Sequence, residues 1–516
     1  MDAISATTFV TALTIVGAVI IVSALLSGLI DRSGLPQVAV FLALGAVLGP
    51  FGLGLLNIPL SSTTLKVVAV LSLALVLFTD AVSLNIKEVR RRAALALRLL
   101  GPGTLLSAAL IALAGWLLLG LSVPAAAILG AALASTDPVL LRGLLRRRDI
   151  PEDARNGLQL ESGLNDAVLL PVVLVSVAFL TPTDSHSGAI FAKLGLDLFI
   201  LGPGAGILIG FVGVAALDLI RKRLGVRRDY ESLYSLGIAF TAFSAAEAVH
   251  ASGFLAAFAA GMTIAALDVE LCDCFVEYGA VTAEMLLLFT FVLLGSSLIW
   301  SGLTVIDGPV LLFTAIAVLI RTPVYLMSLV GSEVDTRGRL LIAWFGPRGL
   351  SSLLLVLLPV FAGVAGSDRL FAICSLVVLV SVVLHGGSPL LLSRIARKRA
   401  KHESEPLVTI EAPVSEEPAE TNVDVPTCEE TCTHAPEGEN REVPLDIGAQ
   451  SISIAELRQL WNAKEPVTIL DVRTERSIQD EVNQVKSAIR MPPDHVVERA
   501  KELGLKQEQW LIAYCA

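Results

Sequence analysis

Long apolar runs separated by short polar stretches fill the first 400 residues of the chain. A helix of about twenty apolar residues crosses the hydrocarbon core of a bilayer, so each run predicts one membrane-spanning helix. The pattern therefore predicts an all-α polytopic membrane protein with about thirteen spans. The runs lie near residues 9–30, 36–56, 64–85, 93–120, 123–142, 158–180, 191–220, 231–249, 252–268, 279–300, 309–330, 338–363 and 370–395.

Composition and charge strengthen this interpretation and add an orientation. Hydrophobic residues make up 54% of the chain and the mean hydropathy is +0.74, which excludes an ordinary soluble protein. Basic residues gather in every other loop between the runs, and such loops remain in the cytoplasm. We therefore expect a multi-pass protein of the inner (cytoplasmic) membrane, with its N-terminus outside and its C-terminal tail inside. The N-terminus lacks the features of a cleaved signal peptide, so the first span is expected to be retained.

The last quarter of the chain is different in character and divides into two parts. Glutamate and proline dominate residues 401–450, which predicts an acidic, disordered linker. Residues 451–516 combine a helix-like pattern with strand-like runs at Val467–Leu470 and Trp510–Tyr514, as in a small α/β module. The predicted domains are thus 1–400 in the membrane, 401–450 as linker and 451–516 as an incomplete soluble module.

Two aspartates inside apolar runs are the strongest candidates for chemistry. Asp137 and Asp166 each place a carboxylate where it costs roughly 3 kcal/mol to insert, so neither is expected by accident. Pro138 interrupts the helix directly after Asp137 and frees carbonyl oxygens beside it. Thr136, Ser162 and Asn165 supply further oxygens, with Ser162 on the same helix face as Asp166. Since a cation and a proton compete for the same carboxylate oxygens, this pattern favours a cation and proton site; hydroxyls that only join helices are the alternative for Ser162 and Thr136.

Four further charged residues lie within or at the edges of apolar runs. Asp80 is a third candidate acid, with a solvated span end as its alternative interpretation. Glu161 needs a basic partner, and we expect a structural ion pair with Arg321 in preference to Arg348. Arg348 lies in a Gly-Pro-Arg-Gly sequence, which predicts a second broken helix. Two breaks seven spans apart are typical of inverted repeats with two discontinuous crossing helices.

These motifs together resemble the monovalent cation:proton antiporters of the NhaP-like sodium/proton exchanger class. The resemblance rests on Thr136-Asp137-Pro138, Glu161-Ser162 with Asn165-Asp166, Phe78-Thr79-Asp80 and Gly346-Pro347-Arg348-Gly349, and it covers roughly residues 8 to 395. It implies a homodimer with a moving core domain, and Asp166 as the principal carrier with Asp137, Thr136, Ser162 and Asp80 around the ion. Asn165 stands where electrogenic relatives carry a second aspartate, which resembles the electroneutral branch.

The tail resembles the first part of a rhodanese-like domain. The resemblance rests on the sequence around Asp471 and Arg473 and on the strand leading to Cys515, at the position of the rhodanese nucleophile. Only one residue follows Cys515, so the loop that would activate its thiol is missing and we expect no sulfurtransferase activity from this sequence. A selenocysteine codon read as a stop is one hypothesis for the abrupt end, beside simple degeneration.

The sequence thus predicts a transporter rather than an enzyme, exchanging Na+ or Li+ for H+ and contributing to pH homeostasis. A K+/H+ antiporter is the alternative within transport, and a membrane-tethered sulfurtransferase or redox sensor is the alternative from another class. We expect no cofactor, no metal beyond the transported cation and no nucleic-acid partner. About thirteen spans exceed what an anchor needs, which favours transport.

Overall fold

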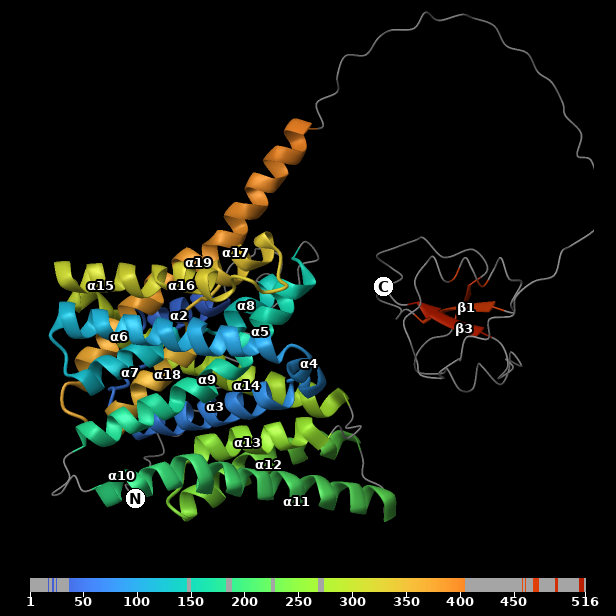
Figure 1. The fold of residues 1–516 in the computed structure, drawn as a ribbon, viewed down its shortest axis with the longest axis horizontal. Helices are drawn as coiled ribbons and strands as arrows, with labels where there is room; N and C mark the ends of the chain where they lie inside the picture. The colour runs from blue at the N-terminus through green and yellow to red at the C-terminus, as the bar shows by residue number, and fades with distance from the viewer. Residues whose placement is uncertain are drawn as a thin grey trace, which may run out of the picture. The chain divides into compact units, whose positions relative to one another are not determined.

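The computed structural model of the chain describes residues 37–145, 150–181, 188–223, 228–267, 273–403, 467–472, 488–490 and 510–514, and single positions at 17, 21, 22, 25, 457 and 460. Two compact units are present, Met1–Ile410 and Glu411–Ala516. The first is a helical bundle and the second contains a small sheet (Figure 1). The predicted first span and most of the predicted linker lie outside the described residues.

The helices of the first unit run side by side in one bundle (Figure 1). Its first half comprises α2 (Gln37–Leu48), α3 (Thr63–Val82), α4 (Ile86–Arg91), α5 (Ala93–Arg98), η1 (Leu99–Leu105), α6 (Leu106–Leu119), α7 (Val123–Ala134), α8 (Pro138–Leu145), α9 (Glu152–Leu180), α10 (Gly188–Leu196) and η2 (Asp197–Leu201). Its second half comprises α11 (Gly202–Arg223), α12 (Arg228–Ala248), α13 (Gly253–Leu267), α14 (Asp273–Leu293), η3 (Leu294–Leu298), η4 (Ile299–Val305), α15 (Gly308–Leu319), α16 (Arg321–Ser328), α17 (Thr336–Trp344), α18 (Leu350–Phe361) and α19 (Ser367–Glu403).

The described helices confirm a mostly helical polytopic membrane protein, but their lengths fall into two groups. Seven helical stretches in the described part are long and apolar enough to cross a membrane. Five other apolar helices are shorter, with 10 to 17 residues. Two of the short ones border a break at a charged residue and a proline, which follows α7 and precedes α18. In the predicted total of about thirteen spans, each broken helix, α7 with α8 and α17 with α18, is counted as one span.

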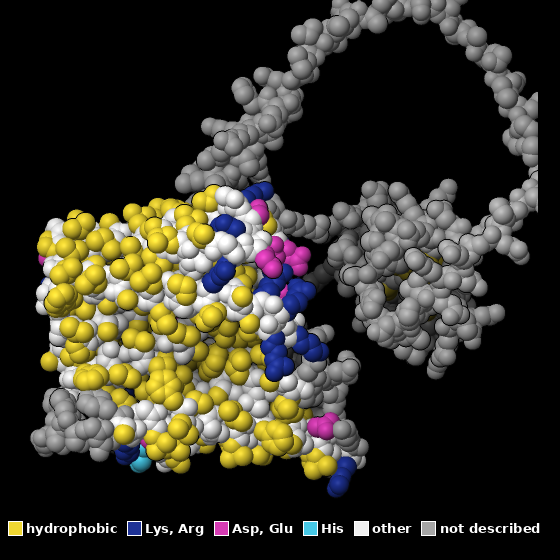
Figure 2. Space-filling model, viewed as in Figure 1, with side chains coloured by type: hydrophobic (Ala, Val, Ile, Leu, Met, Phe, Trp, Pro, Cys, Tyr) yellow, Lys and Arg dark blue, Asp and Glu magenta, His cyan; other side chains and the backbone are white. Residues whose placement is uncertain are grey.

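The surface of the helical unit fits a bilayer. Figure 2 shows hydrophobic side chains over most of the visible face, with basic side chains gathered at the edge where α4 lies. Large apolar side chains such as Trp116 and Phe211 are half exposed, at 50% and 55%. Exposed apolar groups are stable against lipid and costly against water, so this face is a membrane face.

Small residues bring helices of the bundle into close contact. A Cβ added at Gly130 of α7 would lie 2.3 Å from the Ala108 carbonyl oxygen of α6, and one at Gly261 of α13 would lie 2.5 Å from the Phe78 carbonyl oxygen of α3. Such close backbone approach is how membrane helices gain packing energy without a hydrophobic driving force. It holds α7 and α3 against their neighbours, and both helices in turn contact α9, which carries Asp166.

The second unit contains a three-stranded parallel sheet in the order β2-β1-β3. Its strands are β1 (Val467–Asp471), β2 (Ile489–Arg490) and β3 (Trp510–Tyr514), with Val467 paired to Trp510 and Leu470 to Ile489. Parallel strands need crossover connections, as in α/β modules. Asp471 is buried at the end of β1, whereas Arg473 and Cys515 lie outside the described residues.

Candidate functional site

Two interruptions of helical structure meet inside the bundle. The first lies between α7, which ends at Ala134, and α8, which begins at Pro138. The second lies between α17 and α18, over residues 345–349. The Asp137 backbone N–H donates to the Pro347 carbonyl oxygen at 3.0 Å, so the two non-helical segments contact each other directly. Each break leaves helix ends with unpaired backbone groups inside the protein, and these ends need partners.

Side chains of opposite charge satisfy the helix ends across this contact. Asp137 Oδ2 accepts a hydrogen bond of 2.7 Å from the backbone N–H of Leu350, the first residue of α18. Arg348 Nη1 donates to the carbonyl oxygens of Ala134 and Ser135 at the end of α7, at 3.0 and 3.4 Å. A carboxylate thus lies at a helix N-terminus and a guanidinium at a helix C-terminus, where the helix dipoles favour them. Each break supplies the charged group that the other break requires.

Glycines at the second break make this contact possible. A Cβ added at Gly349 would lie 2.0 Å from Asp137 Oδ2, and one at Gly346 would lie 2.1 Å from Arg321 Nε. Both separations are far below van der Waals contact, so the carboxylate and the guanidinium occupy the space that a side chain would need.

We expect Gly349→Ala to displace the Asp137 carboxylate and to lower the melting temperature of the purified protein, since overpacking a tight site costs about 1–3 kcal/mol. Thermal unfolding in detergent measures the change. Gly237→Ala in α12 is the matched control, because a Cβ there meets nothing within 4 Å. An unchanged melting temperature for Gly349→Ala would contradict the close approach.

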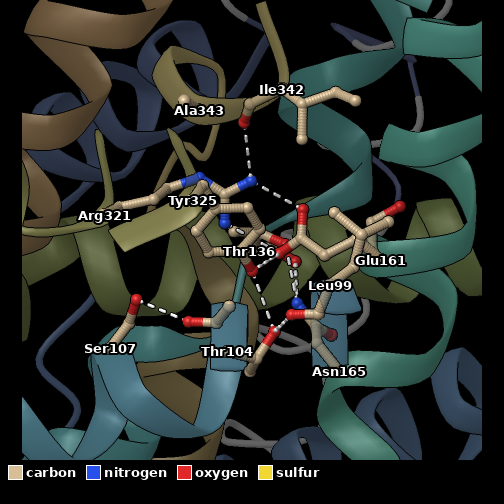
Figure 3. Close-up of polar contacts among 12 residues, drawn as sticks. Leu99, Thr104, Ser107, Thr136, Glu161, Asn165, Arg321, Tyr325, Ile342 and Ala343 are labelled. Atoms are coloured by element: carbon tan, nitrogen blue, oxygen red, sulfur yellow. Dashed lines mark hydrogen bonds and ion pairs between the residues drawn. The ribbon is translucent and has the colours of Figure 1, made fainter. Parts of the chain in front are cut away.

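Glu161 of α9 forms the predicted type of ion pair, and its partner is Arg321. Arg321 Nη1 and Nη2 donate to the two carboxylate oxygens at 2.8 and 2.7 Å, and Nη2 also donates to the Ile342 carbonyl oxygen at 3.0 Å. Figure 3 shows the Arg321 guanidinium pointing at Glu161 with the Tyr325 ring beside it. Arg321 Cζ lies 3.8 Å from the centre of that ring. Both charged side chains are buried, so the pair is a fixed part of the fold.

Two neutral side chains complete the Glu161 cluster. The Tyr325 hydroxyl donates to Glu161 Oε1 at 3.0 Å, and the Thr136 hydroxyl donates to the same oxygen at 3.0 Å. Thr136 Oγ1 in turn accepts from Asn165 Nδ2 at 2.6 Å. The expected neighbour of the ion, Thr136, therefore links Glu161 to Asn165 (Figure 3).

Asp166 has a different environment from the other buried acids. Its Oδ1 accepts from the Ser135 hydroxyl at 2.5 Å. Its Oδ2 is buried and has no hydrogen-bond partner among the described residues, and the same is true of Asn165 Oδ1. Glu161 has Arg321 and Asp137 has the N-terminus of α18, whereas Asp166 faces the neutral hydroxyls of Ser135 and Ser351. Buried carboxyl and amide oxygens with spare lone pairs are suited to bind an alkali cation, or a proton on the carboxylate.

Two other candidates from the sequence lie near Asp166 with different contacts. The Ser162 hydroxyl donates to the Gln159 carbonyl oxygen of its own helix at 3.4 Å. Asp80, at the end of α3, is half-buried, and its carbonyl oxygen lies 4.0 Å from where a Cβ on Gly163 of α9 would stand. Thus α3 passes one helical turn from Asp166.

Sequence reasoning missed Ser135 and Tyr325 as members of the site. Ser135 is the first residue of the broken segment, so its place in Ser-Thr-Asp-Pro was the available signal. Tyr325 follows Arg321 by four residues and therefore shares its helix face, which was the corresponding signal for the Glu161 cluster.

The first turn of α9 is tied to the segment before the predicted fourth span. Arg92 donates from Nη1 to Asp153 Oδ1 and from Nε to Glu88 Oε1, both at 2.5 Å. Arg91 also bonds Glu88, and this hydrogen bond lowers the pKa of the Glu88 carboxyl below its usual range. These pairs fix the end of α9 that lies nearest Glu161.

Broken helices that cap each other, around a buried carboxylate with one unpartnered oxygen, define a secondary transporter of ions. The chain belongs to the sodium/hydrogen exchanger family, because the model of its transmembrane domain matches residues 18–393. This confirms the family resemblance, and the members of this class are transporters rather than enzymes.

Similar proteins agree with this assignment. The chain is 27% identical over 415 residues to the K(+)/H(+) antiporter NhaP of Alkalimonas amylolytica, covering 79% of this chain and 69% of that protein. It is 27% identical over 381 residues to the K(+)/H(+) antiporter NhaP2 of Shewanella sp. (strain MR-4), covering 73% of this chain and 65% of that protein. The chain therefore spans about two thirds of the length of these relatives.

The fold is similar to that of a solved antiporter. The sodium proton antiporter MjNhaP1 of Methanocaldococcus jannaschii superposes with a TM-score of 0.61 at 20% identity, covering 75% of this chain and 98% of that one. The fold of the membrane unit is thus the NhaP fold.

Proposed function

We propose that the chain exchanges a monovalent alkali cation for a proton across the membrane, with Asp166 as the carrier. One observation carries the proposal: Asp166 is buried in the bundle with one carboxylate oxygen free of any partner among the described residues. The acids beside it are already neutralised, Glu161 by Arg321 and Asp137 by a helix end. Asp166 therefore gains most from binding a cation or a proton, and both compete for the same oxygens.

The neighbours of Asp166 have distinct roles in this proposal. Asn165 Oδ1 and the Ser135 hydroxyl oxygen provide neutral ligands beside the carboxylate. Asp137 and Thr136 hold the broken helix in place around them. Ser162 and Asp80 line the approach along α9 and α3. Since Asn165 is neutral, a single charge is carried in each direction, which supports electroneutral exchange of one cation for one proton.

Na+ or Li+ is the proposed cation, with K+ as the second candidate. MjNhaP1 is named a sodium proton antiporter, whereas the relatives from Alkalimonas and Shewanella are named K(+)/H(+) antiporters. The carboxylate and amide oxygens at the site suit any of these hard cations. The proposal includes a role in pH homeostasis, which proton exchange would serve.

The proposed assembly is a homodimer in the inner membrane, with the N-terminus outside and the tail inside. We propose about thirteen spans arranged as an inverted repeat, in which α7–α8 and α17–α18 are the two discontinuous crossing helices. The mutual contact of the two breaks supports this symmetry. A rhodanese-like identity of the second unit is supported by its parallel strands and by the buried Asp471 at the end of β1.

Relaxation of a preformed proton gradient in proteoliposomes tests the proposed exchange. We expect addition of Na+ or Li+ to relax the gradient of wild-type vesicles, with a rate independent of an imposed membrane potential. The same chain ended after Glu403 is expected to retain this activity, because every residue of the site precedes that position. Relaxation by K+ alone would select the second candidate. Failure of all three ions in both the full and the shortened chain would overturn the proposed function.

A further inference from the structure

The non-helical segment that carries Arg348 is held from its other side by α19. The Arg348 backbone N–H donates to the Ser381 hydroxyl oxygen at 2.7 Å. Ser381 Oγ lies 3.1 Å from His385 Nδ1, one turn further along α19. Arg348, Ser381 and His385 are all buried, with exposed fractions of 1%, 0% and 5%. These three groups form a continuous chain of hydrogen bonds from an imidazole to the backbone of the broken helix.

His385 also contacts the helix before the break. Its ring centre lies 5.5 Å from that of Trp344, the last residue of α17, with the ring planes tilted by 47°. The imidazole therefore touches α17 directly and reaches the segment before α18 through Ser381. A single side chain of α19 is thus linked to both sides of the interruption.

The Ser381 hydroxyl can join both ends of this chain of hydrogen bonds. Ser381 Oγ accepts from the Arg348 N–H and keeps its own proton, which it can donate to His385 Nδ1. A neutral imidazole with its proton on Nε2 accepts there. Without this acceptor the serine hydroxyl would turn to a carbonyl of the preceding helical turn, which is its usual alternative in a helix. His385 accordingly fixes the hydroxyl that fixes the Arg348 backbone.

The Arg348 backbone sets the position of two contacts at the candidate site. Its side chain reaches the Ser135 carbonyl oxygen, and Ser135 donates to Asp166. Two residues later the Leu350 N–H donates to Asp137. A shift of the Arg348 nitrogen would therefore reach both aspartates. We propose that His385, acting through Ser381, is a positioning residue that sets the affinity of the site for the transported cation; this rests on the site assigned under the proposed function.

Transport kinetics of His385→Leu and Ser381→Ala in proteoliposomes test the inference. We expect the KM for Na+, or for whichever cation relaxes the gradient, to rise about three- to tenfold in each variant, which is what loss of one hydrogen bond permits. The maximal rate is expected to stay near that of the wild type. The double variant is expected to match the single ones, because both break the same chain. His385→Asn, whose amide oxygen takes the place of Nδ1, is expected to restore most of the affinity.

Ser375→Ala is the matched control on the same helix. Ser375 is buried like Ser381, but its hydroxyl has no hydrogen-bond partner among the described residues. The KM of Ser375→Ala for the cation is therefore expected to equal that of the wild type. An unchanged KM in both Ser381→Ala and His385→Leu, or additive effects in the double variant, would overturn the inference while wild-type exchange upheld the proposed function. Absence of exchange in the wild type would overturn both. Should His385→Leu fail to fold, Ser381→Ala alone decides the outcome.

Discussion

An Asp166→Asn variant is expected to fold and insert but to show no cation-induced relaxation of a proton gradient. The amide has nearly the shape of the carboxylate and can still accept from the Ser135 hydroxyl, so the packing around it is retained. It carries no negative charge and binds no exchangeable proton near neutral pH. Both halves of the exchange cycle are lost together, and the rate should fall to that of empty vesicles.

The stability of Asp166→Asn separates this loss from misfolding. A buried acid whose hydrogen-bond partner is a neutral hydroxyl is costly to the fold, so its replacement by a neutral isostere should leave the free energy of unfolding unchanged or raise it. Thermal unfolding of the detergent-solubilised protein measures this. Asp368→Asn, at an exposed acid in the first turn of α19, is the control and is expected to exchange at the wild-type rate. Retained exchange in Asp166→Asn would remove Asp166 as the carrier.

The features that could be predicted from sequence are those with a large local cost. A carboxylate at Asp166, a proline after Asp137 and a glycine pair around Arg348 each conflict with a regular apolar helix, so each is visible without knowledge of the fold. The need of a buried acid for a base led from Glu161 to Arg321. The structure brings these two residues together across 160 positions of sequence.

The parts that could not be predicted depend on how distant helices pack. Serine and tyrosine hydroxyls are common in membrane helices, so local position alone did not identify Ser135 as the partner of Asp166 or Tyr325 as a donor to Glu161. Helical spacing correctly gave Ser162 the same face as Asp166 but not its rotamer, and its hydroxyl bonds its own helix. Spacing fixes the direction of a Cβ, while the choice of partner is made by the neighbouring helix.

The two broken helices also combine a feature that local sequence predicts with one that depends on packing. Each break could be recognised alone, since proline and glycine interrupt helices through local chemistry. That Asp137 caps α18 and Arg348 caps α7 requires the two segments to meet, which only the folded bundle provides. The position of each break is therefore predictable from local sequence. The contacts that join the two breaks into one site depend on how the helices pack.

The largest effect on stability is expected from Arg321→Ala. Arg321 donates both terminal nitrogens to Glu161, and both side chains are buried, at 2% and 0% exposure. Removing the guanidinium leaves a carboxylate uncompensated, for which a loss of about 3–5 kcal/mol in the free energy of unfolding is expected. Thermal unfolding in detergent should show a large fall in the melting temperature, whereas Arg90→Ala at an exposed arginine of α4 should change it little.

Removal of both charges tests whether the loss comes from the stranded carboxylate. Glu161→Gln combined with Arg321→Gln leaves no buried ion at the pair, and neutral groups of similar size replace buried ion pairs at little net cost. We therefore expect the double variant to melt well above Arg321→Ala. A double variant as unstable as the single one would mean that packing, such as the contact of Arg321 with the Tyr325 ring, dominates instead. In either case Arg321→Ala loses exchange because the fold is weakened, whereas Asp166→Asn loses it in a stable fold, and this contrast separates the structural ion pair from the carrier.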